Sequence, residues 1–123
     1  GRCNTFTPPV AVFPAHSAPV GLQFYKGNAF GAHYAGGAFI AFHGSWNRAP
    51  FPQLEGNITF VPFVNGQAGK PEIFASGFAG KPQIMLPNEA AARPNGVAEA
   101  PDGSLYIIDN VKGKVWRVFH RAR

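Results

Sequence analysis

The sequence has 123 residues, which fits one domain, and its 15 glycines, 12 prolines and 12 phenylalanines exclude a helical bundle, because breakers this frequent leave no room for long helices. Lys and Arg outnumber Asp and Glu by 11 to 6, but no nucleic-acid-binding module is visible, so we expect no nucleic-acid partner. No apolar run could span a membrane and no signal peptide is visible, so we expect a mature soluble chain or a fragment of a longer one.

The N-terminal segment, residues 1–18, is predicted to be extended. Pro8, Pro9 and Pro14 exclude a central strand, and the short apolar stretch from Val10 to Phe13 predicts one edge strand. Cys3 has no partner for an internal disulfide, so we expect a plain thiol.

Two strands are predicted next, at 19–25 and 38–42, with a glycine-rich loop from Lys26 to Gly36 between them. The second is an unbroken apolar run bounded by glycine, which is typical of a strand buried on both faces. Five polar or aromatic residues follow that run directly, where a rigid strand can present side chains to a ligand: His43, Ser45, Trp46, Asn47 and Arg48.

An irregular connection is expected at 49–56, and the alternating residues 57–63 predict a half-buried strand. Asn65-Gly66 predicts a tight turn, and Glu72 to Ala75 predicts another short strand. Residues 77–93 are predicted to form a long connection containing at most one helical turn near Asn88.

The C-terminal third predicts three antiparallel strands, at 96–100, 105–109 and 114–119. Short turns at 101–103 and 110–113 separate them, and connections this short cannot cross over to a parallel neighbour. The positive charge of the chain is densest here, in Lys112, Lys114, Arg117, Arg121 and Arg123.

The two halves of the chain repeat one pattern. Pro19-Val-Gly-Leu matches Pro94-Asn-Gly-Val, Gly37-Ala-Phe-Ile-Ala matches Gly103-Ser-Leu-Tyr-Ile, and the strand at 57–63 matches the strand at 114–119. A repeated four-stranded antiparallel unit is the signature of β-propeller blades, and a β-sandwich of seven or eight strands is the alternative. We therefore predict an all-β fold, with a first blade at 19–80 and a second, incomplete blade at 81–123.

Less than two full blades cannot close a ring. The chain is therefore expected to be a fragment, a subunit of a ring built from several chains, or an open pair of sheets. Incomplete blades leave apolar surface and an unpaired strand edge, which predicts self-association.

The positions of the candidate site residues separate ligand-facing side chains from turn residues. Arg48 and Arg93 lie at loop–strand junctions expected on one face, whereas Asp102, Asp109 and Asn110 lie in tight turns, where Asp and Asn bond the backbone. His16, His33 and His120 lack metal-site spacing, so no metal ligand is predicted from spacing.

Several runs of residues resemble the C-terminal part of the glucose/sorbosone dehydrogenase family. They are Ala15-His-Ser-Ala-Pro-Val-Gly, Phe24-Tyr25, Gly37-Ala-Phe-Ile-Ala-Phe-His-Gly-Ser-Trp-Asn-Arg48, Gly77-Phe78 and the run from Arg93 to Asn110. The resemblance covers nearly the whole chain. The His-Gly-Ser-Trp-Asn-Arg run is specific, whereas Pro-Asp-Gly-Ser-Leu-Tyr is shared by many propellers.

The resemblance implies a six-bladed propeller that binds pyrroloquinoline quinone (PQQ), often with calcium, and transfers hydride from an aldose or sorbosone-type sugar to the quinone. It implies a periplasmic or secreted protein, and an electron acceptor such as a cytochrome or quinone. By position, Arg93 matches a cofactor-facing arginine, Asn95 falls where some relatives have a second arginine, and the stretch with His43, Trp46, Asn47 and Arg48 falls where relatives place polar residues toward the cofactor.

The sequence also departs from the family pattern. The general base and most calcium ligands of the family belong to earlier blades that this sequence does not contain, and Leu54-Glu55-Gly56 replaces the usual Gly-Tyr. We therefore expect this chain alone to be inactive and to supply part of the cofactor wall. The alternative is a non-enzymatic propeller or sandwich module that binds carbohydrate or protein.

Overall fold

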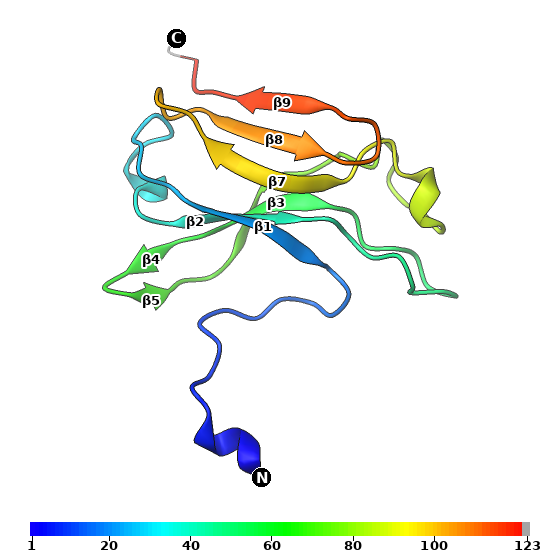
Figure 1. Cartoon of the computed structure of the whole chain (residues 1–123), viewed down its shortest axis with the longest axis horizontal. Helices are drawn as coiled ribbons and strands as arrows, with labels where there is room; N and C mark the ends of the chain where they lie inside the picture. The colour runs from blue at the N-terminus through cyan, green and yellow to red at the C-terminus, as the bar shows by residue number, and fades with distance from the viewer. Residues whose placement is uncertain (122–123) are drawn as a thin grey trace.

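A computed structural model describes residues 1–121, so Arg123 of the basic tail and the last two residues of the predicted second blade lie outside the described residues. The described chain is all-β, with three single-turn 3-10 helices (Figure 1). The elements in order are η1 (Arg2–Thr5), β1 (Pro19–Phe24), η2 (Ala32–Tyr34), β2 (Ala38–Phe42), β3 (Asn57–Val61), β4 (Phe63–Val64), β5 (Gln67–Ala68), β6 (Glu72–Ala75), η3 (Pro87–Glu89), β7 (Pro94–Glu99), β8 (Leu105–Asp109) and β9 (Val115–Val118). No helix within residues 1–121 is long and apolar enough to cross a membrane.

The first half forms a four-stranded antiparallel sheet in the order β1-β2-β3-β6, here called sheet 1. β2 is buried at every residue, which confirms the prediction from its unbroken apolar run. The half-buried alternation predicted for 57–63 is wrong, because β3 ends at Val61 and Ile58 to Val61 are all buried. β3 is a central strand whose two faces are both covered, and its polar Thr59 is satisfied by a hydrogen bond to Asn57.

The Asn65-Gly66 turn forms as predicted, but it joins two strands that the sequence reading did not separate. Asn65 and Gly66 both have positive φ, 51° and 76°, which is the geometry of a tight hairpin turn. β4 and β5 pair across this turn as a small separate sheet, and β6 follows with the predicted bounds.

The second half forms the predicted antiparallel meander β7-β8-β9, here called sheet 2. β8 alternates between buried and exposed residues, with Leu105, Ile107 and Asp109 facing inward. The two sheets lie one above the other in Figure 1, with β1 beside β7.

The repeat read from the sequence is also a structural repeat. A register shift separates Pro19 from Gly21 in the pairing of β1 with β2, and the same irregularity separates Pro94 from Gly96 in the pairing of β7 with β8. A Cβ atom on Gly21 would lie 2.9 Å from the Cα of Gly96. The two Pro-x-Gly segments therefore touch, and glycine is required at this close approach of the two sheets.

An aromatic core fills the space between the sheets. Phe39 and Phe60 from sheet 1 are fully buried with Leu105 and Ile107 from sheet 2. Phe39 packs edge-on against Tyr25 at 5.5 Å, and rings from the loop and from β6 extend the cluster: Phe30, Tyr34 and Phe74. Burial of this many large rings supplies most of the attraction between the sheets.

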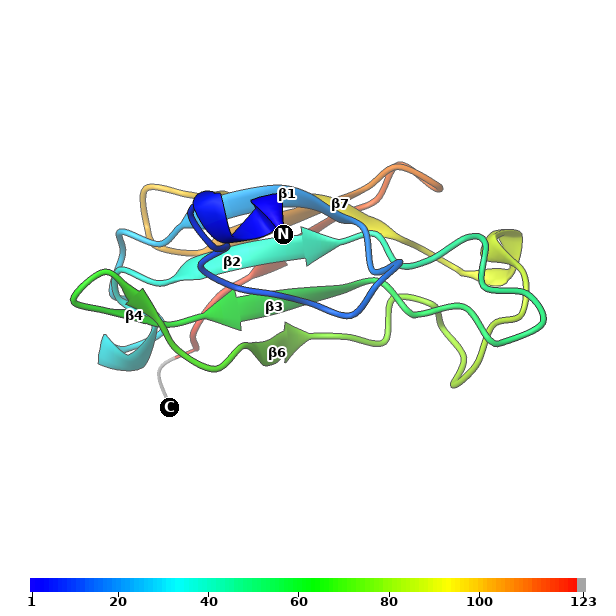
Figure 2. The same ribbon diagram turned by 90° about the horizontal axis from the view of Figure 1, so that it is seen from below.

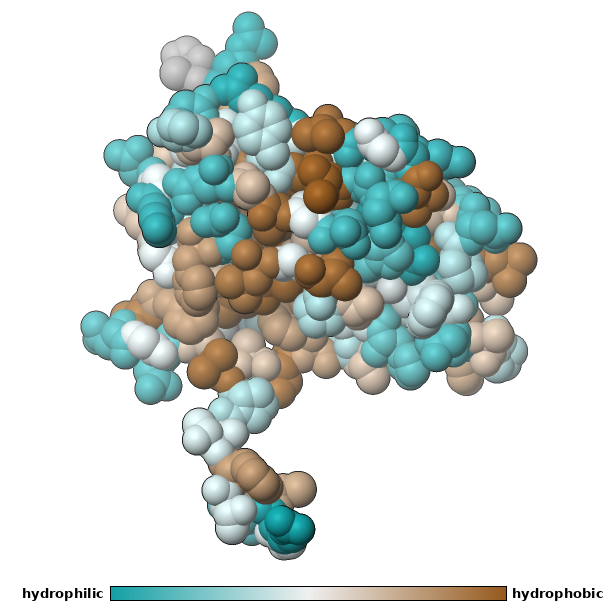
Figure 3. All heavy atoms as spheres, in the orientation of Figure 1, coloured by the Kyte–Doolittle hydropathy of each residue, from teal (hydrophilic) through white to brown (hydrophobic). Residues whose placement is uncertain are grey.

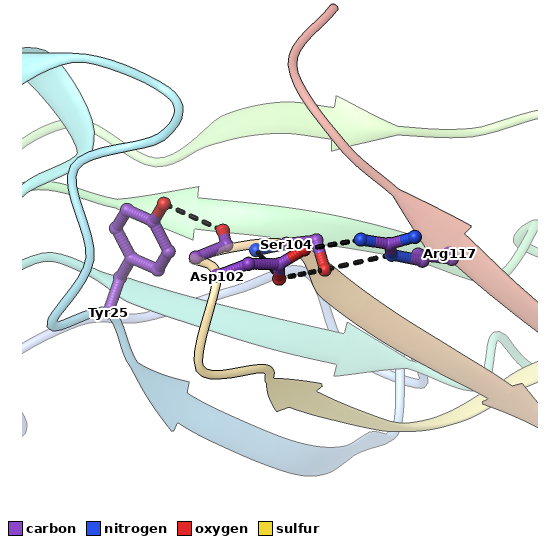
Figure 4. A network of polar contacts seen from close by, with 5 residues as sticks. Tyr25, Asp102, Ser104 and Arg117 are labelled. Carbon is purple, nitrogen blue, oxygen red and sulfur yellow. Dashed lines mark hydrogen bonds and ion pairs between the residues drawn. The ribbon is translucent and has the colours of Figure 1, made fainter.

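A hydrogen bond joins the two sheets at the end where β2 begins, and a polar network within sheet 2 lies beside it (Figure 4). The Tyr25 hydroxyl donates to the Gly103 carbonyl at 2.8 Å, and Asp102 accepts from Ser104 and pairs with Arg117. These hydrogen bonds lower the pKa of Asp102 to about 2, with Ser104 the main cause and Arg117 a further one. Asp102 therefore accepts hydrogen bonds within its own tight turn, as its position in the sequence predicts.

The N-terminal segment crosses the outer face of sheet 1 (Figure 2), but the strand predicted within Val10 to Phe13 does not form. Phe13 is anchored there, with its ring 4.9 Å from that of Phe42. Phe13 and the β4–β5 hairpin cover Ile40, Phe42 and Val61, which explains why β2 and β3 are buried on both faces.

Candidate functional site

The ends of β2 and β8 and the start of β7 surround an open hollow of about 340 Å³. It brings together three of the six predicted site residues, His43, Trp46 and Asn95. The remaining lining residues are Ala18, Val20, Gly44 and Asn110. The hollow therefore draws on both structural repeats, and neither half could form it alone.

His43 joins the two sheets across the hollow. Its Nε2 lies 3.0 Å from the Asn110 Oδ1, and its backbone N–H donates to Ala18 at 2.9 Å. A neutral imidazole with a proton on Nε2 donates to this amide oxygen and leaves Nδ1 free to accept. His43 is thus oriented from β8 as well as from its own strand.

Trp46 presents a flat apolar surface beside this pair, with 75% of its area exposed. The chain turns at Gly44, where φ is +84° and a Cβ would lie 2.5 Å from the Leu54 carbonyl oxygen. Only glycine fits this turn. The turn leaves Trp46 on the surface, whereas the preceding residue, Ser45, is buried. An exposed indole held by a buried turn can stack on a planar ligand or a sugar ring.

Arg93 lies behind the hollow and does not line it. The residue is only 6% exposed, its Nε donates to the His43 carbonyl at 3.0 Å, and its Nη2 donates to the Ser45 carbonyl. Burial lowers the pKa of its guanidinium below the usual value, but the group remains a cation. Arg93 therefore fixes the loop that carries the hollow and places a positive charge beneath it.

Arg48 and Asn47 lie farther along the same loop and do not line the hollow. The Arg48 Nη1 donates to the Pro52 carbonyl at 2.9 Å within its own loop, and Asn47 is exposed. The two arginines predicted on one face are therefore apart in the structure. Arg93 donates to the loop carbonyls from behind the hollow, whereas Arg48 donates to Pro52 at the far end of the loop.

A buried polar cluster that the sequence reading missed supports this loop. The Ser45 hydroxyl donates to Gln53 Oε1 at 2.9 Å and accepts from the Leu54 N–H at 2.6 Å, and Gln53 Nε2 donates to the Met85 carbonyl at 3.1 Å. Gln53 also bridges to Ile84 through its backbone. No local pattern marks Gln53, because its side-chain nitrogen and its backbone bond a segment about thirty residues away. The sequence predicts Asn110 as a turn residue, and only the packing of the two sheets brings its side chain to His43.

Asp109 is a structural carboxylate behind the site. Burial raises its pKa, but the backbone N–H groups of Arg93, Val111, Lys112 and Lys114 together bring the pKa below the usual value. Its oxygens accept from Arg93, Val111 and Lys112 at 2.7–3.0 Å, which confirms the predicted turn role. Within residues 1–121 no group of three or more His, Cys, Asp or Glu side chains could hold a metal ion.

Comparison with known proteins gives one family and several structural neighbours. The model of the family described as TrAA12-like matches residues 1–121. An uncharacterized protein of Borreliella burgdorferi is 31% identical over 115 residues, which are 94% of this chain and 29% of that protein.

Three solved structures share the fold. The structure titled as a Trichoderma reesei carbohydrate-active enzyme of family AA12 has a TM-score of 0.65 and 26% identity over 94% of this chain and 28% of that one. The PQQ domain of a pyranose dehydrogenase from Coprinopsis cinerea has a TM-score of 0.59 and 22% identity over 96% and 31%. A glucose dehydrogenase has a TM-score of 0.60 and 18% identity over 94% and 29%. The chain thus spans less than a third of the length of each relative.

Proposed function

The chain belongs to the TrAA12-like family, and on that premise we propose that it is part of a PQQ-dependent sugar dehydrogenase, in which it forms one wall of the cofactor site. The hollow at the strand ends carries the proposal, because it gathers His43, Asn95 and Asn110 beside the exposed Trp46. The finer arrangement that we propose is a six-bladed propeller, with blades at 19–80 and 81–123 and the remaining blades outside this chain.

Two features support the propeller arrangement. The sheets repeat the same strand order and the same bulge, and each carries apolar residues on its outer face as well as its inner one. Val20 and Leu22 are exposed on sheet 1, and Tyr106 and Ile108 are exposed on sheet 2. On the face of the molecule shown in Figure 3, hydrophobic side chains gather over the region from β8 and β9 down to β1. Sheets stacked on both sides would cover these residues.

The residues present fit a planar, anionic cofactor. The side-chain amides of Asn95 and Asn110 are hydrogen-bond donors, and the Nδ1 of His43 is an acceptor. Trp46 offers a stacking surface, and the buried charge of Arg93 attracts carboxylates to this end of the sheets. PQQ, when bound, supplies the redox chemistry by accepting hydride from a sugar. Calcium would need ligands outside residues 1–121.

The residues of this chain would bind and orient rather than react. Arg93 and Gln53 hold the loop rigid, so that Trp46 and His43 meet the cofactor without an ordering cost at binding. His43 is engaged with Asn110, and we assign it a binding role. The general base is proposed to lie outside this chain.

Tryptophan fluorescence can test the cofactor site, because the chain has two tryptophans and only Trp46 lines the hollow. In a Trp116→Phe background, PQQ should quench the emission of Trp46 in a saturable manner. Asn95→Ala should weaken this quenching several-fold, whereas Gln83→Ala, an exposed change elsewhere, should leave it unaltered. Unsaturable quenching, or equal quenching in the Asn95→Ala variant, would overturn the proposal.

The exposure of Trp46 also favours a second candidate, a carbohydrate-binding module without a quinone. That candidate predicts saturable binding of aldoses with loss on Trp46→Ala and no response to PQQ. Titration of the same single-tryptophan variant with glucose and with PQQ separates the two functions.

A further inference from the structure

The backbone of His43 is held from two directions where it lines the hollow. Its N–H donates to the Ala18 carbonyl at 2.9 Å, and its carbonyl accepts from the Arg93 Nε at 3.0 Å. Ala18 has a φ of 53°, in the left-handed region that a residue other than glycine rarely adopts. A locally unfavourable conformation before β1 therefore helps to place His43 at the end of β2.

The side chain of Asn110 determines which nitrogen of His43 carries the proton. The Asn110 Oδ1 lies 3.0 Å from the His43 Nε2, and an amide oxygen can only accept. The proton of a neutral imidazole can occupy either ring nitrogen, and the hydrogen bond made by one nitrogen sets the state of the other. Nε2 is therefore protonated, and Nδ1 keeps a lone pair.

This lone pair is accessible and unused. The His43 Nδ1 has no hydrogen-bond partner within residues 1–121, where Nε2 is the ring nitrogen that bonds Asn110. No buried side-chain nitrogen or oxygen in the same part of the chain lacks a partner. Nδ1 is therefore open to solvent, and a ligand in the hollow that His43 lines can reach it.

The groups around His43 divide between those that favour an anion and the one that favours a hydroxyl. Arg93 lies behind the loop as a cation, Lys112 follows in the turn after β8, and the amides of Asn95 and Asn110 can donate. A carboxylate oxygen placed at the His43 Nδ1 would instead face a lone pair, whereas a hydroxyl group can donate to it. The hollow thus offers donors for acid groups and a separate acceptor for a hydroxyl.

We propose that Asn110 is a positioning residue, which holds His43 with its proton on Nε2 so that Nδ1 accepts a hydrogen bond from one hydroxyl group of a bound sugar. The inference rests on the proposed function for the sugar as ligand. It assigns His43 a role in selecting the sugar and Asn110 a role that acts through His43.

Selective ¹⁵N labelling of the histidine rings reports the tautomer, because a protonated ring nitrogen and one with a lone pair have separate chemical shifts. His43→Gln assigns the His43 signals among those of the four histidines. At about pH 9, where imidazole is neutral, we expect the parent chain to have protonated Nε2 and lone-pair Nδ1. Asn110→Ala should give a mixture of tautomers, and Asn110→Asp, which keeps an acceptor oxygen, should restore the parent signals. Asn110 is exposed and has no positive φ, so both variants should fold.

Titration with glucose then tests the acceptor without PQQ. Glucose should shift the His43 Nδ1 signal in a saturable manner, and Asn110→Ala should weaken this response several-fold. One monodeoxy derivative of glucose should bind about tenfold more weakly and leave the Nδ1 signal unshifted, which identifies the donating hydroxyl. His33, whose ring contacts Glu72 outside the hollow, is the internal control and should not respond.

Four outcomes would overturn the inference. They are a proton on Nδ1 in the parent chain, the same tautomer population in Asn110→Ala as in the parent, a shift at Nδ1 that persists with every monodeoxy sugar, and no response of His43 to glucose at about 100 mM. Failure of the proposed function has a different signature, since PQQ would then leave the Trp46 emission unquenched while the His43 signals still respond to glucose.

Discussion

Replacement of Arg93 by methionine tests whether this residue braces the loop of the candidate site. Arg93 donates to the carbonyl groups of His43 and Ser45 from a position that is 6% exposed. Methionine keeps most of the apolar stem but leaves both carbonyls without their donor. Each buried acceptor that loses its partner costs about 1–3 kcal/mol, so the two together cost about 2–6 kcal/mol.

Two effects reduce this cost. The guanidinium no longer has to be desolvated, and water can reach the His43 carbonyl from the open hollow. We therefore expect Arg93→Met to lower the free energy of unfolding by about 2–4 kcal/mol, which corresponds to a fall in Tm of about 10 °C for a domain of this size.

Arg48→Met provides the matched control. Arg48 is half-buried and donates one hydrogen bond to Pro52 within its own loop, so its replacement should cost less than about 1 kcal/mol. Urea unfolding followed by circular dichroism measures both variants. Equal losses in the two variants, or a loss below about 0.5 kcal/mol for Arg93→Met, would refute the bracing role.

Three further predictions concern stability. Gly21→Ala should cost about 1–3 kcal/mol, because the new Cβ would lie 2.9 Å from the Gly96 Cα and the sheets must separate; a urea midpoint equal to that of the parent chain would contradict this contact. Phe39→Ala should cost about 3–5 kcal/mol in the same assay and Phe24→Ala less than half as much, since Phe39 is fully buried and Phe24 is 49% exposed. The folded-state pKa of Asp102, about 2, lies below its ordinary value of 3.8, so its contribution is present above pH 3.8 and is lost as the pH falls through 2. Asp102→Asn should therefore flatten the fall in stability between pH 4 and 2, and an unchanged acid profile would show that the contacts of Asp102 with Ser104 and Arg117 do not matter.

Local patterns were sufficient for most of the strands. The unbroken apolar run of β2, the turn residues at Asn65-Gly66 and Asp102-Gly103, and the alternation in β8 each act over a few residues, so the bounds of these elements could be read from the chain. The half-burial predicted for β3 is wrong, because Phe13 and the β4–β5 hairpin cover the outer face of the strand. The alternation of residues within β3 carries no information about these segments. The strand expected at 10–13 does not form, because none of the strands described within residues 1–121 pairs with it.

The candidate site shows the same division. Local pattern alone predicts that polar residues follow a buried strand at His43 to Arg48 and that Arg93 precedes the matching strand of the second repeat. Which of these residues share a surface depends on the packing of sheet 1 on sheet 2, because this packing brings His43 to Asn110 and Asn95 and turns Arg93 inward to the loop carbonyls. Strand formation depends on neighbours along the chain. The direction and partner of a polar side chain depend instead on which distant segment has taken the hydrogen-bonding groups around it.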